Sequence, residues 1–281
     1  MIRDITIGQY YPANSPIHRL DPRVKLFATF MFIIAVFCVN NFIGFGLAIL
    51  MFALIVHQST IPFRYMLRGL KAIFILLIFS VIMNLFLNRQ GEVVFQFWIL
   101  TITDEGIYTA AFIGLRLILL VLGSSLMTLT TTPLELTDAI EKSMRPLKKI
   151  HVPVHEIAMM MSIALRFIPI LLEETDKIMK AQQARGADFE SGNLLQRAKS
   201  MVPILVPLFI SAFRRADELA TAMEARCYRG DVGRTRMKEM VYTKKDKVAY
   251  LWVFAGLAIL IATRWIPSLP EIVRLLCGGI L

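Results

Sequence analysis

Five long apolar runs constrain this chain more than any other feature of its sequence. A helix needs about 20 apolar residues to cross a hydrocarbon core of roughly 30 Å. Hydrophobic residues make up 56% of the 281 residues, which is more than a soluble core of this size has to bury. The sequence therefore predicts an all-α polytopic membrane protein with about five transmembrane helices. The expected spans are residues 26–40, 42–57, 72–88, 107–130 and 248–265.

The positive charges are distributed unevenly along the chain. Of the 31 lysines and arginines, 4 lie in the first 25 residues, 3 lie in residues 58–71 and 20 lie in residues 131–247. Because cytoplasmic loops of membrane proteins are enriched in positive charge, these three segments are expected on the cytoplasmic side of the cell membrane. The C-terminus is then expected outside. Topology accounts for the net charge of +10, and no nucleic-acid partner is predicted.

A basic segment of more than a hundred residues separates the fourth apolar run from the fifth. It divides the chain into an N-terminal arm with four spans (1–130), a cytoplasmic helical region (131–247) and a last span with its tail (248–281). Glycine just past a helical pattern is a typical helix stop, and Gly186 and Gly230 stand at such positions. Three helices are predicted in the middle region, at about 133–146, 154–185 and 194–229.

Two apolar runs inside this middle region, 157–165 and 201–213, are too short to cross a membrane. Arg166, Pro169 and Glu173-Glu174 bound the first run, and Pro203, Pro207 and Arg214-Arg215 bound the second. They are predicted to belong to amphipathic helices that lie along or beneath the bilayer.

Two arginines end apolar stripes at the same helical spacing. The residues of each stripe are seven apart, which is about two helical turns, and the two sets differ by a constant offset of 41 residues. An arginine at the end of an apolar stripe suits a helix docked in a partner's groove, where the planar guanidinium can bind a carboxylate through two hydrogen bonds. The alternative is that the arginines only complement the negative end of the helix dipole. The stripes are Leu171, Ile178, Arg185 and Ala212, Leu219, Arg226.

Two further features predict structural roles. Arg116 lies within the fourth span, where an unpaired charge costs about 2.5 kcal/mol or more, so it is expected to face protein or water. Asn84 in the third span is a possible polar neighbour. Near the N-terminus, Asp21 followed by Pro22 predicts the cap and first residue of a helix. We interpret the arm before it as an anchor at the membrane interface.

Several function classes are disfavoured by what the sequence lacks. No Asp or Glu lies within the five predicted spans, so a proton or sodium relay has no carboxylate to use. No Gly-Lys dipeptide of a P-loop is present, and the three cysteines have no metal-binding spacing. We therefore predict no catalytic residue, metal or cofactor in this chain. A membrane-embedded enzyme using His151, His155 and Glu156, or a stand-alone secondary transporter, remains the alternative.

Three segments carry a resemblance to a known family. The chain closely resembles the transmembrane T components of energy-coupling factor transporters, which are ATP-driven importers of vitamins and metals. The match covers most of the length. It is carried by SPIHRLDPRVK at residues 15–25, AQQARGADFESG at residues 181–192, and MEARCYRG at residues 223–230 leading into GRTR at residues 233–236.

This resemblance implies the following partners and site residues. Two ABC-type ATPase subunits would hydrolyse ATP, and a separate S component would bind the substrate, so the chain itself would be a non-catalytic scaffold and coupling subunit in the membrane lipid. Residues 131–247 would be the coupling region. Cys227 stands where the family usually has Gly or Ser, so the resemblance leaves the cap geometry at this position open but not the role of Arg226. The implied ATPase-binding residues are Ala184, Arg185, Gly186, Ala225, Arg226 and Cys227.

Overall fold

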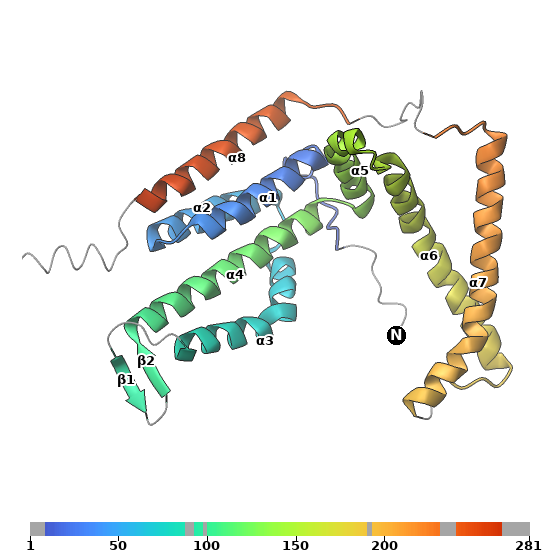
Figure 1. Cartoon of the computed structure of the whole chain (residues 1–281), viewed down its shortest axis with the longest axis horizontal. Coiled ribbons are helices and arrows are strands. Elements are labelled where there is room, and N and C mark those ends of the chain that lie inside the picture. Colours follow the sequence, from blue (N-terminus) through green and yellow to red (C-terminus); the bar gives the residue numbers. More distant parts are fainter. Residues whose placement is uncertain (1–8, 88–92, 98–99, 190–192, 231–239, 266–281) are drawn as a thin grey trace, which may run out of the picture. The chain divides into compact units, whose positions relative to one another are not determined.

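The computed structural model describes residues 9–87, 93–97, 100–189, 193–230 and 240–265 (Figure 1). It is almost entirely helical, which confirms the predicted all-α class. The chain divides into two compact units. Gly8–Thr132 and Met240–Leu281 form one, which we call the membrane unit, and Pro133–Glu239 forms most of the other, which we call the insert unit.

Each of the five predicted spans corresponds to a helix of the membrane unit. Helices α2, α4 and α8 have the length and hydropathy of a membrane span, and α3 does so if its two parts are taken together. Helix α1 has 17 residues and is about 25 Å long, which is the lower limit for a span. The helices are α1 (Pro22–Cys38), α2 (Phe42–Ser59), α3 (Phe63–Leu87), α4 (Asp104–Thr130) and α8 (Lys244–Ala262).

Helix α3 differs from the predicted third span. It begins at Phe63, nine residues before the predicted start at 72, and its parts Phe63–Lys71 and Ile73–Leu87 meet at an angle of 64°. Residue 88, the predicted end, lies outside the described residues. The sequence expectation missed the first part because its three cations interrupt the apolar pattern.

A short antiparallel hairpin, which was not predicted, joins α3 to α4. Its strands are β1 (Val93–Phe97) and β2 (Leu100–Thr103), with Phe97 paired to Leu100. Valine, phenylalanine and threonine favour extended structure, which explains the hairpin locally. Thr103 then caps α4, because its hydroxyl accepts a hydrogen bond of 3.1 Å from the Gly106 amide.

The core of the membrane unit is formed by close contact between α1, α2, α4 and α8. Small residues allow this approach, as they do in many membrane helix pairs. At Gly123 of α4, an added Cβ atom would lie 2.8 Å from the Phe32 ring of α1, so only glycine fits without a shift. The main buried cluster consists of Ala35, Val36, Val39, Phe45, Ala48, Phe112, Leu119 and Leu260.

Arg116 of α4 is paired with the C-terminal end of α1. Its Nη2 atom donates to the Val39 carbonyl at 2.9 Å and to Asn40 Oδ1 at 3.3 Å. The end of a helix carries partial negative charge, so a cation is stabilised there. The suggested neighbour Asn84 instead donates to the Ser80 carbonyl of its own helix at 2.8 Å. The expected structural role of Arg116 therefore has a partner, but it is the α1 terminus.

The insert unit contains three α-helices among its described residues. They are α5 (Pro133–Met144), followed by a 3₁₀ helix (Arg145–Ile150), then α6 (Val154–Ala184) and α7 (Leu194–Ala225). Helix α5 gives way to the 3₁₀ helix because Pro146 cannot continue the α-helical hydrogen bonding. Helix α6 as a whole has the length and hydropathy of a span. Length therefore does not exclude a membrane crossing, and its place beneath the bilayer stays a prediction.

Candidate functional site

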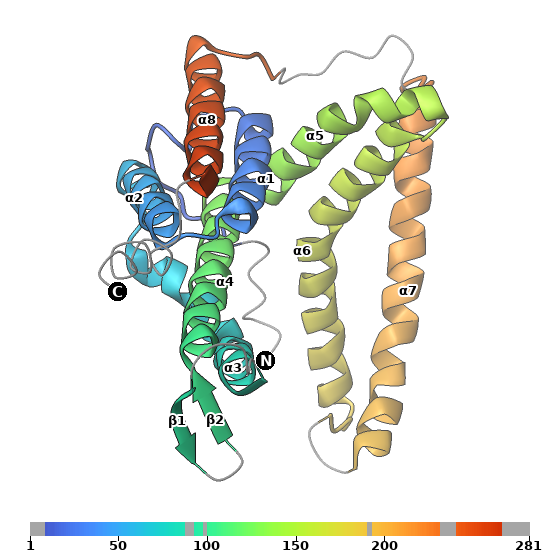
Figure 2. The same cartoon turned by 60° about the vertical axis from the view of Figure 1, so that its left-hand side comes forward.

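Helices α6 and α7 pack side by side and run in opposite directions (Figure 2). Near the start of α6, Met159 Sδ accepts a 3.2 Å hydrogen bond from the hydroxyl of Tyr228, which follows the end of α7. Further along, Glu174 of α6 forms a 3.5 Å ion pair with Arg215 of α7. The C-terminal end of α6 and that of α7 therefore lie at opposite ends of the pair.

This antiparallel packing separates the two candidate arginines. The contacts above place Arg185 level with roughly residue 203 of α7. At about 1.5 Å of rise per residue, Arg226 is then about 35 Å away along the pair. One protein groove could not hold both arginines, but two separate subunits could each reach one.

The C-terminus of α6 has the hydrogen bonds of a Schellman cap. The Gly186 amide donates to the Gln183 carbonyl at 2.9 Å, and the Ala187 amide donates to the Gln182 carbonyl at 3.0 Å. Gly186 has φ +88°, a left-handed conformation that glycine adopts without steric cost. Arg185 is the cap residue itself.

The C-terminus of α7 repeats this cap with cysteine in place of glycine. The Cys227 amide donates to the Glu224 carbonyl at 2.8 Å, and the Tyr228 amide donates to the Met223 carbonyl at 3.1 Å. Cys227 has φ +54°. The cap geometry at Cys227, which the resemblance left open, is therefore the same as at Gly186. The predicted helix end at residue 229 was wrong. The helix ends at Ala225 because Cys227, rather than Gly230, takes the closing left-handed position.

The strained conformation of Cys227 leads to a testable prediction. Left-handed geometry costs a residue with a side chain about 1–2 kcal/mol, which glycine does not pay. We expect Cys227→Gly to stabilise the insert unit by about 1 kcal/mol and Gly186→Ala to destabilise it by a similar amount. Thermal unfolding of the purified full-length variants measures both changes. Equal stability of Cys227→Gly and the unchanged protein would contradict the assignment.

Each arginine presents an exposed side chain at a helix end. The flanking Ala184, Gly186, Ala225 and Cys227 are exposed as well, whereas the stripe residues Leu171, Ile178, Ala212 and Leu219 are half-buried. Within the described part of the chain, neither Arg185 nor Arg226 has an ion-pair or hydrogen-bond partner for its guanidinium. Each predicted triplet thus forms one small surface with an available cation.

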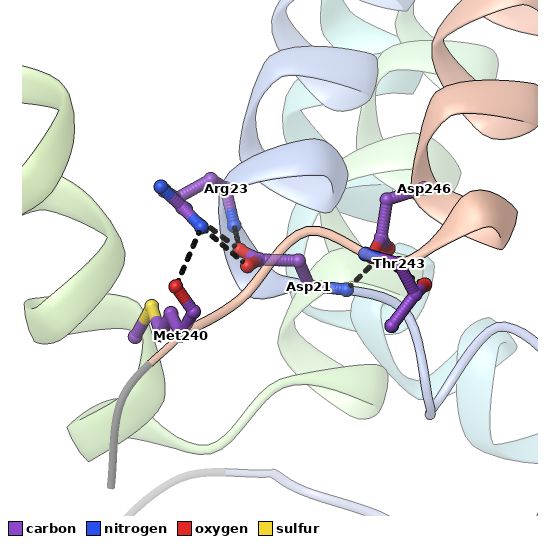
Figure 3. A network of polar contacts seen from close by, with 5 residues as sticks. All are labelled: Asp21, Arg23, Met240, Thr243 and Asp246. Carbon is purple, nitrogen blue, oxygen red and sulfur yellow. Dashed lines mark hydrogen bonds and ion pairs between the residues drawn. The ribbon is translucent and has the colours of Figure 1, made fainter.

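A second polar site lies in the membrane unit, and we call it the polar clamp (Asp21, Arg23, Lys25, Thr243 and Asp246). Figure 3 shows all of its residues except Lys25, together with Met240. Asp21 caps α1, as predicted, by accepting a 2.9 Å hydrogen bond from the Arg23 amide. Its carboxylate also binds the Arg23 guanidinium through two contacts, of 2.7 and 3.0 Å. Arg23 in turn donates to the Met240 carbonyl at 3.3 Å, which ties the start of α1 to the segment before α8.

Asp246 of α8 completes this connection. It is 1% exposed, and its Oδ1 atom accepts a 2.9 Å hydrogen bond from the Asp21 amide. Its Oδ2 atom accepts from the Thr243 amide at 2.7 Å and from the Thr243 hydroxyl at 2.6 Å, which forms a capping box at the start of α8. Both carboxylate oxygens are therefore used, one within α8 and one across to α1.

Lys25 extends the clamp to the end of α4. Its buried Nζ atom donates to the Thr130 carbonyl at 2.8 Å and to the His18 carbonyl at 3.0 Å. Burial of the His18 ring lowers the pKa of this histidine, so the neutral ring is favoured at pH 7. Because the Tyr11 carbonyl can only accept, Nε2 donates to it at 3.1 Å, and Nδ1 accepts from the Ser15 hydroxyl at 2.7 Å.

The clamp residues show what the sequence expectation missed. The arm was interpreted as an interfacial anchor, but its motif also joins α1, α4 and α8 through buried polar contacts. Thr243 and Asp246 were not singled out, although threonine followed three residues later by an acid is close to a capping-box signature. The clamp contacts Thr130 and Met240, which lie at or near two of the points where the chain leaves or re-enters the membrane unit.

Comparison with known proteins identifies the family. Residues 13–239 match the protein family described as "Cobalt transport protein" (CbiQ). The "Energy-coupling factor transporter transmembrane protein EcfT" of Ruminiclostridium cellulolyticum is 58% identical over 246 residues, which cover 88% of this chain and 92% of that protein. The chain belongs to the EcfT family. EcfT of Clostridium kluyveri is 56% identical over 94% of this chain and 98% of its own length, and EcfT of Bacillus subtilis is 46% identical over 94% and 100%.

Membership of the EcfT family confirms the resemblance seen in the sequence. This chain is the transmembrane T component of an energy-coupling factor transporter, and it is a non-catalytic, multi-pass membrane subunit. Among the residues that the structure describes, no group of three or more His, Cys, Asp or Glu side chains is placed to hold a metal ion.

Proposed function

We propose that this T component docks on two ABC-type ATPase subunits, through Arg185 on one and Arg226 on the other. The observation that carries the proposal is the repeated cap. Two exposed arginines occupy the same cap position on two helices, and the antiparallel packing directs them to opposite ends of the pair. A pair of identical or related grooves on two ATPases would match this arrangement.

The physical reason for arginine at these positions is its shape. The planar guanidinium offers paired N–H donors to a carboxylate, and its weak hydration lowers the cost of burial in an interface. Each arginine also extends from the last turn of a rigid helix, so a displacement of the groove moves the whole helix. Movements of the ATPases on binding and hydrolysing ATP would reach α6 and α7 in this way.

A second partner, the substrate-binding S component, would receive this movement. Helices α6 and α7 expose large apolar side chains, including Met160 at 58%, Phe209 at 60% and Phe213 at 73%. Exposed apolar side chains of this size suit a protein or membrane partner, and methionine adapts to partners of different shape. Vitamin or other micronutrient specificity would belong to the S component.

The charge distribution supports an orientation for the complex. The insert unit and the N-terminal arm carry most of the positive charge, which favours the cytoplasmic side. ATPases that use cytoplasmic ATP would meet Arg185 and Arg226 there. The chain would thus be a multi-pass protein of the cell membrane with a cytoplasmic N-terminus and coupling region.

Co-purification tests the proposed docking. When the tagged chain is co-expressed with its ATPase subunits, we expect Arg185→Ala and Arg226→Ala each to reduce ATPase recovery several-fold, because each variant loses one anchor. Lys180→Ala is the matched control, because Lys180 is an exposed cation of α6 that points about 140° away from Arg185 around the helix. If both arginine variants recovered as much of both ATPases as Lys180→Ala, the proposed docking would be refuted.

A further inference from the structure

The first part of α3 carries a stripe of exposed cations. Arg64, Arg68 and Lys71 are spaced by four and three residues, which places them within about 60° of one another around the helix. All three side chains are exposed. The opposite side of this segment is buried, with Met66 fully covered at 0% exposure. The stripe therefore faces away from the core of the membrane unit.

No carboxylate of the membrane unit neutralises this stripe within the described residues. The acidic residues described in that unit are Asp21 and Asp246, which are buried in the polar clamp, and Asp104 and Glu105, which begin α4. Gly69 packs against Ser125, near the other end of α4. This places Asp104 about 30 Å from the stripe along the helix axis. The three cations thus form a local positive surface.

Apolar side chains border the stripe on the exposed side. Phe63 is 52% exposed and Leu67 is 42% exposed, and both lie next to the cations around the helix. After the 64° bend, Ile73–Leu87 exposes further large apolar residues, including Phe74, Ile75 and Phe79. If this second part crosses the bilayer, the first part is inclined steeply to the membrane normal and lies where α3 enters the membrane.

We propose that Arg64, Arg68 and Lys71 bind the headgroup phosphate of anionic glycerophospholipids, with Phe63 and Leu67 inserted among the acyl chains. A helix with adjoining cationic and apolar exposed faces is suited to the membrane interface. The stems of Arg and Lys lie along apolar surface while their charged ends reach the phosphates. Each cation close to an anionic membrane surface is expected to contribute roughly fivefold in affinity.

Native mass spectrometry of the full-length chain tests this lipid site. The purified chain in detergent is titrated with phosphatidylglycerol and, separately, with phosphatidylcholine. We expect preferential binding of phosphatidylglycerol, and we expect Arg64→Gln/Arg68→Gln/Lys71→Gln to weaken it at least tenfold without changing phosphatidylcholine binding. The charge-preserving Arg64→Lys/Arg68→Lys variant is expected to stay within about threefold of the unchanged chain.

The matched control is Lys244→Gln/Lys245→Gln/Lys247→Gln. These exposed lysines begin α8 at the same end of the membrane unit, but they point in different directions around their helix. Their substitution removes the same net charge as the α3 triple variant. An equal loss of phosphatidylglycerol binding in both triple variants would show a non-specific charge effect and overturn the proposed lipid site. Unchanged phosphatidylglycerol binding in the α3 variant would also overturn it. Displacement of the lipid by millimolar inorganic phosphate would assign the cations to a soluble anion instead. None of these outcomes depends on ATPase docking.

Discussion

Replacing both Arg185 and Arg226 by alanine is expected to abolish assembly with the ATPase subunits and, with it, ATP-driven uptake. Truncation of a central interface arginine typically costs at least about 2 kcal/mol, which is roughly 30-fold in affinity. In a single variant, the remaining arginine still holds the ATPase pair. We expect the double variant to bind at least about tenfold more weakly than either single variant. The difference between the double and single variants is measured as the affinity of the purified ATPase pair for the chain in nanodiscs.

Lysine substitutions separate the docking proposal from the helix-dipole alternative. Arg185→Lys/Arg226→Lys keeps both charges near the helix ends, so the dipole interpretation expects nearly unchanged assembly. Docking by the planar guanidinium expects a clear loss, because lysine cannot form the paired hydrogen bonds. If the double alanine variant bound the ATPase pair as tightly as the more impaired of the two single variants, only one arginine would contact an ATPase.

Replacing Asp246 by alanine is expected to destabilise the membrane unit by about 3 kcal/mol. The substitution removes a buried carboxylate, and it leaves the buried Asp21 amide and the part-buried Thr243 amide and hydroxyl without this acceptor. Thermal unfolding of the detergent-solubilised full-length chain, followed by tryptophan fluorescence or by size-exclusion recovery, measures the change.

Two controls define the Asp246 result. Asp246→Asn keeps one carbonyl acceptor and is expected to lose less stability than Asp246→Ala. Glu105→Ala removes an exposed acid from the first turn of α4 and is expected to cost about 0.5 kcal/mol. If Asp246→Ala were as stable as Glu105→Ala, the clamp would not contribute to the stability of the membrane unit.

The local sequence pattern predicted much of the fold. The five apolar runs indicated the helices of the membrane unit, and Asp21-Pro22 indicated where α1 begins. Gly186 indicated that α6 ends at Arg185, whereas Gly230 placed the end of α7 at residue 229, past its true end at Ala225. These features depend on helical periodicity and on hydrogen bonds between residues a few positions apart, so the sequence alone contains the information.

Only the tertiary structure decided which distant groups meet. Asp21 and Asp246 are separated by 225 positions, and Arg116 finds the end of α1 at a separation of 77. Helices α6 and α7 pack antiparallel, which places the two arginines at opposite ends of the pair. This arrangement brings Met159 to Tyr228. Periodicity sets the direction of a side chain around its own helix. The packing of neighbouring helices decides which partner that side chain reaches.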